Sequence, residues 1–131
     1  MLDASALLEL LLGTIRGRSI GERLADPALA LHVPHLIDVE VAQALRRYVR
    51  KGELEPAAAE DALEHLRSLD LERHAHEPLL DRVWALRANL TAYDAVYVAL
   101  AETLETTLLT CDVKLARAPG LTGRIELIRR P

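Results

Sequence analysis

The sequence has 131 residues, of which 50% are hydrophobic and only 3% aromatic, and its formal net charge is −4 at pH 7. This length suits a single domain over residues 1–131 with a core of Leu, Ala, Val and Ile. The lone cysteine excludes an internal disulfide framework, and no apolar run is long enough to span a membrane. The acidic balance argues against a protein that coats nucleic acid, although bound divalent ions would reverse the local charge. We therefore expect a soluble, cytoplasmic protein.

The chain begins with a short apolar segment that leads directly into a helix. Residues 1–2 are expected to form the stub of a first strand, and residues 6–12 are predicted to form an apolar helix. Asp3 stands at the junction between the two. An ordinary N-cap would explain an aspartate here, and so would a carboxylate that serves a site at the end of a strand.

The next segment is predicted to be mostly irregular. Residues 13–21 are expected to form a flexible loop that carries Arg16 and Arg18, followed by a short helix through residue 25. Residues 29–33 are predicted to form a strand that ends at Pro34. The two arginines lie near Asp3 and are therefore candidates for contacts with phosphate groups.

Two amphipathic helices follow, and together they predict an αα-hairpin. Residues 35–51 carry an apolar stripe at helical spacing, and Glu40 borders this stripe instead of lying opposite it. The far end of the helix is basic and includes Arg46 and Arg47, and Gly52 ends it. A solvated helix end is a more common role for such arginines than a nucleic-acid contact. Residues 56–69 are predicted to form the second helix.

The most informative stretch is a helix predicted to begin after Thr91. Residues 71–75 form a weak strand candidate and residues 78–86 another helix, and then residues 95–101 are apolar on every side. Such a helix is expected to lie deep inside a domain. Thr91 is a good N-cap, which places Asp94 at the third helical position. The two residues would form a capping box, or Asp94 would serve a site at the mouth of the helix.

The last third of the chain contains the clearest strand, over residues 106–111. It ends at Asp112, which opens a short helix over residues 113–117, and residues 125–128 form a final strand. Alternation of strands and helices predicts an α/β fold with a mostly parallel central sheet, flanked by helices on both faces, from which the αα-hairpin protrudes. Ligands of such sheets bind beyond the carboxyl ends of the strands.

Four acidic residues are expected to meet there. This acidic quartet consists of Asp3, Glu40, Asp94 and Asp112. Clustered carboxylates repel one another unless something positive joins them, and ligand sets made only of oxygen suit Mg²⁺ or Mn²⁺. Such a centre can activate water and orient a phosphodiester, so the quartet predicts hydrolysis of a nucleic-acid backbone.

Four segments together resemble the PIN-domain ribonucleases, and specifically the VapC toxins of bacterial toxin–antitoxin pairs. The segments are residues 3–7, residues 34–47, residues 91–95 and residues 108–112. The resemblance covers essentially the whole chain, and the segments follow one another in the expected order and spacing. No single motif is specific, but the ordered set is. One departure is the N-terminus, where the first strand of the family normally has another residue or two before the aspartate.

The resemblance implies a fold, an activity and partners. It implies a PIN-like fold and a Mg²⁺- or Mn²⁺-dependent endoribonuclease that acts on RNA, pairs with a VapB-like antitoxin and forms a homodimer. The quartet corresponds to the catalytic and metal-binding acids of the family. Ser5 and Thr110 correspond to small hydroxyl positions that support the site, and Asn89 to a frequent polar neighbour.

Other polar and aromatic residues are assigned more ordinary roles. The histidines (His32, His35, His65, His74 and His76) offer no spacing that predicts a zinc site with a cysteine. We expect Cys111 to be a small core residue, and Trp84, Tyr93 and Tyr97 to belong to the core.

Two other functions are compatible with parts of the pattern. A phospho-accepting receiver domain has a similar length and class, but Asp3 has no acidic neighbour and Asp94 lies within a helix. A non-catalytic interaction domain would use the acids only as helix caps, and it would show no response to divalent ions.

Overall fold

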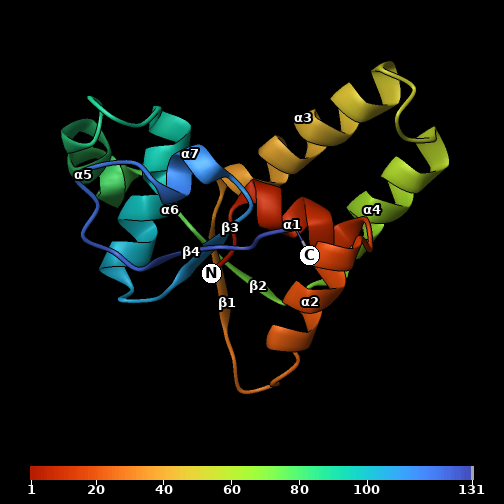
Figure 1. Ribbon diagram of the computed structural model, residues 1–131, viewed down its shortest axis with the longest axis horizontal. Helices are drawn as coiled ribbons and strands as arrows, with labels where there is room; N and C mark the ends of the chain where they lie inside the picture. The colour runs from red at the N-terminus through yellow and green to blue at the C-terminus, as the bar shows by residue number, and fades with distance from the viewer. Residues whose placement is uncertain (131) are drawn as a thin grey trace.

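The structure is a computed structural model that describes residues 1–130 (Figure 1). Its elements in chain order are α1 (Ala4–Leu11), α2 (Ile15–Arg23), β1 (Leu31–Pro34), α3 (Leu36–Arg50), α4 (Pro56–Ser68), β2 (Leu71–His74), the 3-10 helix η1 (Glu77–Leu79), α5 (Leu80–Ala85), α6 (Ala92–Thr103), β3 (Leu108–Thr110), α7 (Val113–Ala116) and β4 (Ile125–Leu127). The order of strands and helices confirms the α/β prediction.

The strands hydrogen-bond in two parallel pairs, where the sequence predicted one central sheet. β1 pairs with β2 and β3 pairs with β4, and an isolated parallel bridge joins Leu2 to Leu109. This bridge is the predicted stub of a first strand. The strands contain three or four residues, so each forms few ladder hydrogen bonds. Packing of side chains, more than a continuous ladder, therefore holds the two pairs beside each other.

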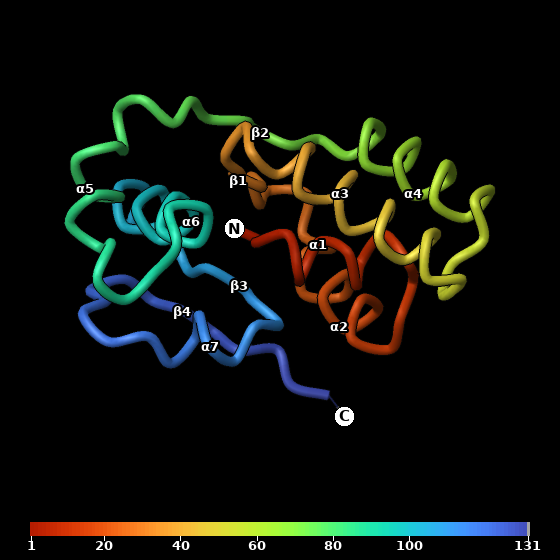
Figure 2. The backbone as a smooth tube through the Cα atoms, turned by 90° about the horizontal axis from the view of Figure 1, so that it is seen from above, coloured from red at the N-terminus to blue at the C-terminus, as the bar shows by residue number. Residues whose placement is uncertain are grey.

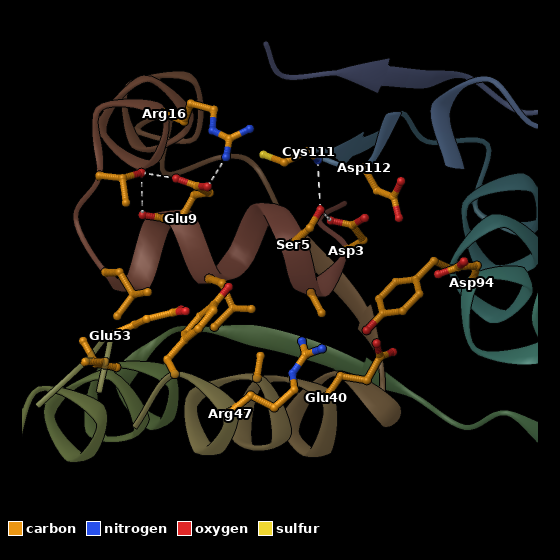
Figure 3. A pocket seen from close by; sticks show the side chains of 18 residues that line it. Asp3, Ser5, Glu9, Arg16, Glu40, Arg47, Glu53, Asp94, Cys111 and Asp112 are labelled. Carbon is orange, nitrogen blue, oxygen red and sulfur yellow. Dashed lines mark hydrogen bonds and ion pairs between the residues drawn. The ribbon is translucent and has the colours of Figure 1, made fainter. Parts of the chain in front are cut away.

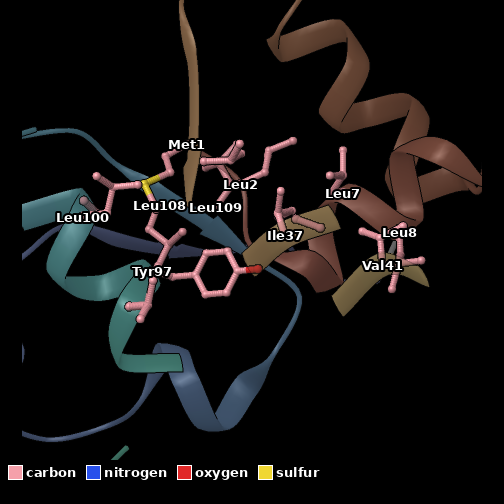
Figure 4. Packing of buried hydrophobic residues seen from close by; sticks show 14 of the residues in the cluster. Met1, Leu2, Leu7, Leu8, Ile37, Val41, Tyr97, Leu100, Leu108 and Leu109 are labelled. Atoms are coloured by element: carbon pink, nitrogen blue, oxygen red, sulfur yellow. The ribbon is translucent and has the colours of Figure 1, made fainter. Parts of the chain in front are cut away.

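Helix α6 lies at the centre of the molecule, as its sequence predicts. Every residue from Ala95 to Ala101 is buried, and the helix contacts both β1 and β3 (Figure 2). On the other side of the strand pairs, α1 contacts β3 and carries the buried residues Ala6, Leu7, Leu8 and Leu11. Leu and Ala side chains from these elements, with Tyr97 among them, form one contiguous core (Figure 4).

The predicted αα-hairpin is present and projects from the rest of the molecule (Figure 1). α3 and α4 pack against each other, and the turn between them contains Gly52 at φ 71°, a left-handed conformation that glycine adopts without strain. The base of α3 packs through Ile37 and Val41, which are fully buried, and α3 also contacts α1. α4 contacts α1 as well, so both helices of the hairpin are anchored to the rest of the core.

The predicted loop over residues 13–21 is wrong, because most of it forms α2. The Thr14 side chain accepts a hydrogen bond from the amide of Gly17 at 3.0 Å and caps this helix. Gly17 lies against α1, where a Cβ atom would stand 1.8 Å from the carbonyl oxygen of Glu9. The glycine that suggests a loop in the sequence instead permits two helices to approach closely.

Two of the three aromatic residues assigned to the core are exposed. Trp84 is 68% exposed and Tyr93 is 63% exposed, whereas Tyr97 is buried. Trp84 lies on the short helix α5 with the guanidinium of Arg87 at 4.7 Å from its ring centroid. Trp84 and Tyr93 therefore lie on the solvent-facing sides of their helices. The short sequence pattern did not distinguish these sides from the buried ones.

Within residues 1–130, none of the helices combines the length and apolar character that crossing a bilayer requires.

Candidate active site

The acidic quartet lines one cavity of about 600 Å³ at the mouth of α6 (Figure 3). The cavity lies between α1, α3, α6 and the start of α7. Its lining includes Asp3, Ala4, Ser5, Leu8, Glu9, Leu12, Thr14, Arg16, Glu40, Ala44, Arg47, Tyr48, Glu53, Leu54, Asp94, Tyr97, Cys111 and Asp112. The quartet stands at one end of this cavity, and the charged residues Glu9, Arg16 and Glu53 stand at the other end (Figure 3). Apolar side chains of α1 and the hairpin also contribute to the lining.

Asp3 is held more firmly than the other members of the quartet. It is the N-cap of α1 and only 4% exposed, and its Oδ1 accepts hydrogen bonds from the Ala6 amide at 2.9 Å and from the Ser5 hydroxyl at 2.7 Å. The hydroxyl of Thr110, at the end of β3, donates to Oδ2. Burial raises the pKa of Asp3 above its ordinary range, although these hydrogen bonds oppose the shift. The predicted supporting hydroxyls Ser5 and Thr110 both lie where they orient this carboxylate.

Glu40 presents an unpaired oxygen inside the cavity. It projects from the first half of α3, and its Oε1 is buried with no hydrogen-bond partner among the described residues. The hydroxyl of Tyr97, on α6, is likewise buried without a partner. Burial raises the pKa of Glu40, the neighbouring Tyr97 hydroxyl opposes this shift, and the charges of Asp94 and Asp3 add to it. Buried polar atoms without partners are costly, so this oxygen is a place where a water molecule or a cation would be stabilised.

Asp94 and Asp112 are half-buried and face each other's charge. The Asp94 amide donates to the Thr91 hydroxyl at 3.2 Å, which is one of the two hydrogen bonds of the predicted capping box. The second bond, from the Thr91 amide to the Asp94 carboxylate, is not among those of the described residues. Burial and the charge of Asp112 raise the pKa of Asp94. Asp112 caps α7, its Oδ1 accepting from the Lys114 amide at 2.8 Å, while its Oδ2 has no partner among the described residues.

The quartet is open enough to admit an ion together with its water. Among the described residues, no three members bring ligand oxygens within 4.8 Å of one another. Mutual repulsion keeps uncompensated carboxylates apart, and Mg²⁺ commonly keeps several waters that bridge to its protein ligands. The donor set contains only oxygen, the Oε1 of Glu40 is buried without a described partner, and three of its members have raised pKa values. It therefore fits a hard divalent cation.

Comparisons with known proteins agree with this geometry. The sequence model of the family described as PIN domain matches residues 1–121 of this chain. The chain belongs to the PIN-domain family. It is 42% identical over 130 residues to Ribonuclease VapC1 of Mycobacterium tuberculosis (strain ATCC 25618 / H37Rv). This match covers 98% of this chain and 97% of that protein. It is 44% identical over 119 residues to Ribonuclease VapC3 of the same strain, covering 90% and 85%.

A solved structure shares the architecture of this PIN domain. The crystal structure of PAE2754 from Pyrobaculum aerophilum superposes with a TM-score of 0.69 at 27% identity, and the match covers 95% of this chain and 80% of that one. With the VapC relatives, this likeness confirms the PIN-like fold and the resemblance to VapC toxins expected from the sequence.

The predicted cationic residues of this PIN domain divide into two groups. Arg47 lines the cavity from α3 and makes no ion pair among the described residues. Arg16 also lines it, but its guanidinium is paired with Glu9, which also accepts a hydrogen bond from Thr14. Arg18 and Arg46 are exposed and lie outside the lining. Only Arg47 therefore combines access to the quartet with an uncommitted charge.

Two further predicted positions differ from expectation. Asn89 is exposed, lies outside the cavity lining and donates a hydrogen bond to the Pro119 carbonyl at 3.4 Å. Cys111 is only half-buried and lines the cavity instead of filling the core, and burial raises the pKa of its thiol to about 11. A thiol with this pKa stays protonated at neutral pH.

Sequence reasoning missed Tyr97 as part of the site. Its position within an apolar helix indicates a core residue, and its ring is indeed packed in the core (Figure 4). Only the spacing from Asp94, almost one helical turn, could have suggested that its hydroxyl reaches the same cavity. Burial is the main cause that raises the pKa of Tyr97, so the phenol remains neutral beside the carboxylates.

Proposed function

We propose that this protein is a metal-dependent endoribonuclease that hydrolyses RNA phosphodiester bonds as the toxin of a toxin–antitoxin pair. The observation that carries the proposal is the acidic quartet, because four carboxylates from four separate segments line one cavity. The VapC relatives are named ribonucleases, which supports the same substrate class.

The quartet would hold Mg²⁺ or Mn²⁺. Asp3 is pre-oriented by Ser5 and Thr110, and Glu40 offers a buried oxygen that lacks a partner. When bound, such an ion activates water for attack on phosphorus and stabilises the leaving oxygen. Burial is the main cause that raises the pKa values of Asp3, Glu40 and Asp94, and the charges of neighbouring acids add to it. A bound cation would favour the charged forms of these carboxylates.

Arg47 would contact the RNA backbone. Its guanidinium lines the same cavity as the quartet and is free to donate two hydrogen bonds to a phosphate. Arg16 would act differently, because its pairing with Glu9 fixes the wall between α1 and α2. Arg18 and Arg46 would touch RNA only where the substrate extends beyond the cavity.

The experiment is a cleavage assay with purified protein and a labelled RNA pool. Cleavage should require Mg²⁺ or Mn²⁺, stop in EDTA, and be abolished by Glu40→Gln. Asp61→Asn removes a carboxylate from the exposed surface of α4, outside the cavity, and should cleave like the wild type. Undiminished cleavage in EDTA, or by Glu40→Gln, would refute the proposal.

The inhibitor would be a VapB-like antitoxin that binds the hairpin and the cavity together. The cavity that holds the carboxylates is also lined by Leu8, Leu12, Tyr48 and Leu54. An amphipathic helix fits this arrangement by placing apolar residues against the hairpin and an arginine against the quartet. A synthetic peptide of that pattern should inhibit cleavage, and its Arg→Ala form should not. Equal inhibition by both peptides would contradict this placement.

A homodimer is proposed from the exposed apolar residues at the end opposite the hairpin. Leu80 and Trp84 on α5 and Tyr93 on α6 are more than half exposed. Covering such residues is a common reason for association between copies. Trp84→Ser should shift the protein toward monomer in sedimentation, whereas an unchanged mass would place the interface elsewhere. We also propose a cytoplasmic location, where RNA and antitoxin would both be available.

A further inference from the structure

A second cluster of metal-binding side chains lies on the β1–β2 strand pair. In the parallel register, His32 of β1 stands opposite Glu72 of β2, and Pro34 opposite His74. Side chains alternate between the two faces of a strand, so Glu72 and His74 share one face of β2 and His32 faces the same side from β1. Val33, on the opposite face, is buried in the core.

The ligand atoms of these three side chains converge. The Nδ1 of His32 lies 3.0 Å from the Nε2 of His74 and 3.4 Å from the Oε2 of Glu72, and all three atoms lie within 4.8 Å of one another. Ligands at the corners of a tetrahedron around zinc are about 3.3 Å apart, because zinc–nitrogen bonds are ~2.0–2.1 Å long. The distances from His32 to His74 and from His32 to Glu72 therefore already match the mutual spacing of zinc ligands, and the third distance is within 4.8 Å.

The chemistry of these donors selects a different cation from the acidic quartet. Two imidazoles and one carboxylate suit zinc and the neighbouring transition metals, whereas Mg²⁺ prefers oxygen ligands alone. The cluster also lies apart from the active site, since none of the three residues lines that cavity. In a metal-free protein, the short His32–His74 distance is accounted for by a hydrogen bond between the two rings.

We propose that His32, Glu72 and His74 form a binding site for a single Zn²⁺ ion, with water as the fourth ligand. His32 and His74 are 42 residues apart in the sequence, and the α3–α4 hairpin lies between them. An ion bound here joins the two strands from which the hairpin departs and returns (Figure 2). A bound ion stabilises the folded state by mass action. The site is independent of the nuclease proposal.

The test is a zinc titration of the full chain against a chromogenic chelator, in excess Mg²⁺ so that the acidic quartet is occupied. The wild type should bind one equivalent of Zn²⁺ and melt at a higher temperature with it. Loss of a residue that only hydrogen-bonds to a metal ligand commonly weakens metal binding ~10–100-fold. Loss of a ligand itself, as in His74→Gln or Glu72→Gln, should therefore weaken zinc binding at least ~10-fold. The Glu72 side chain is 62% exposed, so its replacement leaves the core untouched.

His65→Gln is the matched control, because His65 is exposed on α4 and lies outside the cluster. It should bind zinc like the wild type. Co²⁺ in place of Zn²⁺ should give the strong visible bands of a four-coordinate site without a thiolate charge-transfer band, which excludes Cys111 as a ligand. The proposal is overturned if the wild type binds zinc no more tightly than a His32→Gln/His74→Gln double variant, or if zinc binding survives in folded Glu72→Gln and His74→Gln.

Discussion

Single carboxylates of the quartet both cap a helix and line the cavity of the proposed metal site. Asp112 uses Oδ1 to accept hydrogen bonds from the amides of Lys114 and Leu115, and its Oδ2 has no partner among the described residues. Asp3 likewise caps α1 while it lines the cavity. The two interpretations that the sequence left open for these positions are therefore not exclusive. Capping fixes the orientation of the side chain, and the site uses that orientation.

Tyr97 offers a test at the same scale. Its ring is packed in the core, but its hydroxyl is buried without a described partner. Unsatisfied buried groups cost about 1–3 kcal/mol, so Tyr97→Phe should leave the free energy of unfolding in EDTA unchanged or raised. Tyr97→Ala should lower it by about 3–5 kcal/mol, because it leaves a cavity. Urea unfolding of both variants measures this. A large loss in Tyr97→Phe would show that the hydroxyl is satisfied in the metal-free protein.

Among the helices and strands, the contact between α1 and α2 shapes one wall of the cavity that contains the acidic quartet. Thr14, the N-cap of α2, and Arg16 within α2 both bind Glu9 of α1, and all three residues line the cavity. The close approach depends on Gly17, which leaves no room for a side chain beside the Glu9 carbonyl. The position of this wall is therefore set by the smallest residue in the contact.

Paired glycine substitutions in α2 test this contact. Gly17→Ala places a Cβ atom 1.8 Å from a backbone oxygen, whereas in Gly21→Ala the nearest atom is a leucine methyl at 3.4 Å. Gly17→Ala should lower the free energy of unfolding by about 1–3 kcal/mol or more, because the helices must move apart. Gly21→Ala should be neutral or stabilising by about 0.5–1 kcal/mol, because alanine favours helix. Similar thermal shifts in the two variants would contradict the proposed packing.

The same elements show what the sequence could predict. Helices with strong periodicity or uniform apolarity, such as α3 and α6, were predicted within a residue or two, and Asp3 and Asp112 were found because they follow strands. α2 was not predicted, because Gly17 suggests a loop in the sequence but is required here by the close contact with α1. The convergence of His32 and His74 was invisible because it depends on which strands pair. Long-range contacts set these features, and local pattern does not report them.

At the scale of the whole molecule, the C-terminal segment is tied to the central helix by a polar cluster. Glu102 of α6 accepts hydrogen bonds from Arg82 at 2.7 Å and from the Thr122 hydroxyl at 2.9 Å. Arg82 is the main cause that lowers the pKa of Glu102 below its ordinary value, and Thr122 contributes. The cluster therefore connects α5, α6 and the segment that leads into β4.

This lowered pKa predicts how stability depends on pH. A carboxylate with a lowered folded-state pKa contributes stability that is present above its unfolded pKa of about 4.3 and is lost as pH falls through the folded value. Glu102→Gln should therefore melt below the wild type at pH 6, and the difference should shrink toward zero under more acidic conditions. Glu64→Gln, which removes an exposed pair with Arg67, is the control and should change little at either pH. A difference that grows with acidity would contradict this assignment.

Comparison of Asp94→Asn with Thr91→Ala tests whether the quartet is one metal-dependent catalytic centre. Asp94→Asn keeps the shape of the side chain and the amide that Thr91 caps, but it removes one charge and one ligand. Thr91→Ala removes the cap and keeps the charge. RNA cleavage in Mn²⁺ and melting temperature with Mn²⁺ or EDTA are measured for both variants.

If the quartet is such a centre, we expect opposite behaviour in the two variants. Asp94→Asn should abolish cleavage, lose most of the Mn²⁺-induced rise in melting temperature, and melt no lower than the wild type in EDTA, because like charges ~4 Å apart repel by about 1 kcal/mol even in water. Thr91→Ala should retain cleavage and the Mn²⁺ response while losing about 0.5–2 kcal/mol of stability. If Asp94→Asn instead cleaves RNA and responds to Mn²⁺ like the wild type, while melting lower in EDTA, Asp94 is only a helix cap and the proposed active site is wrong.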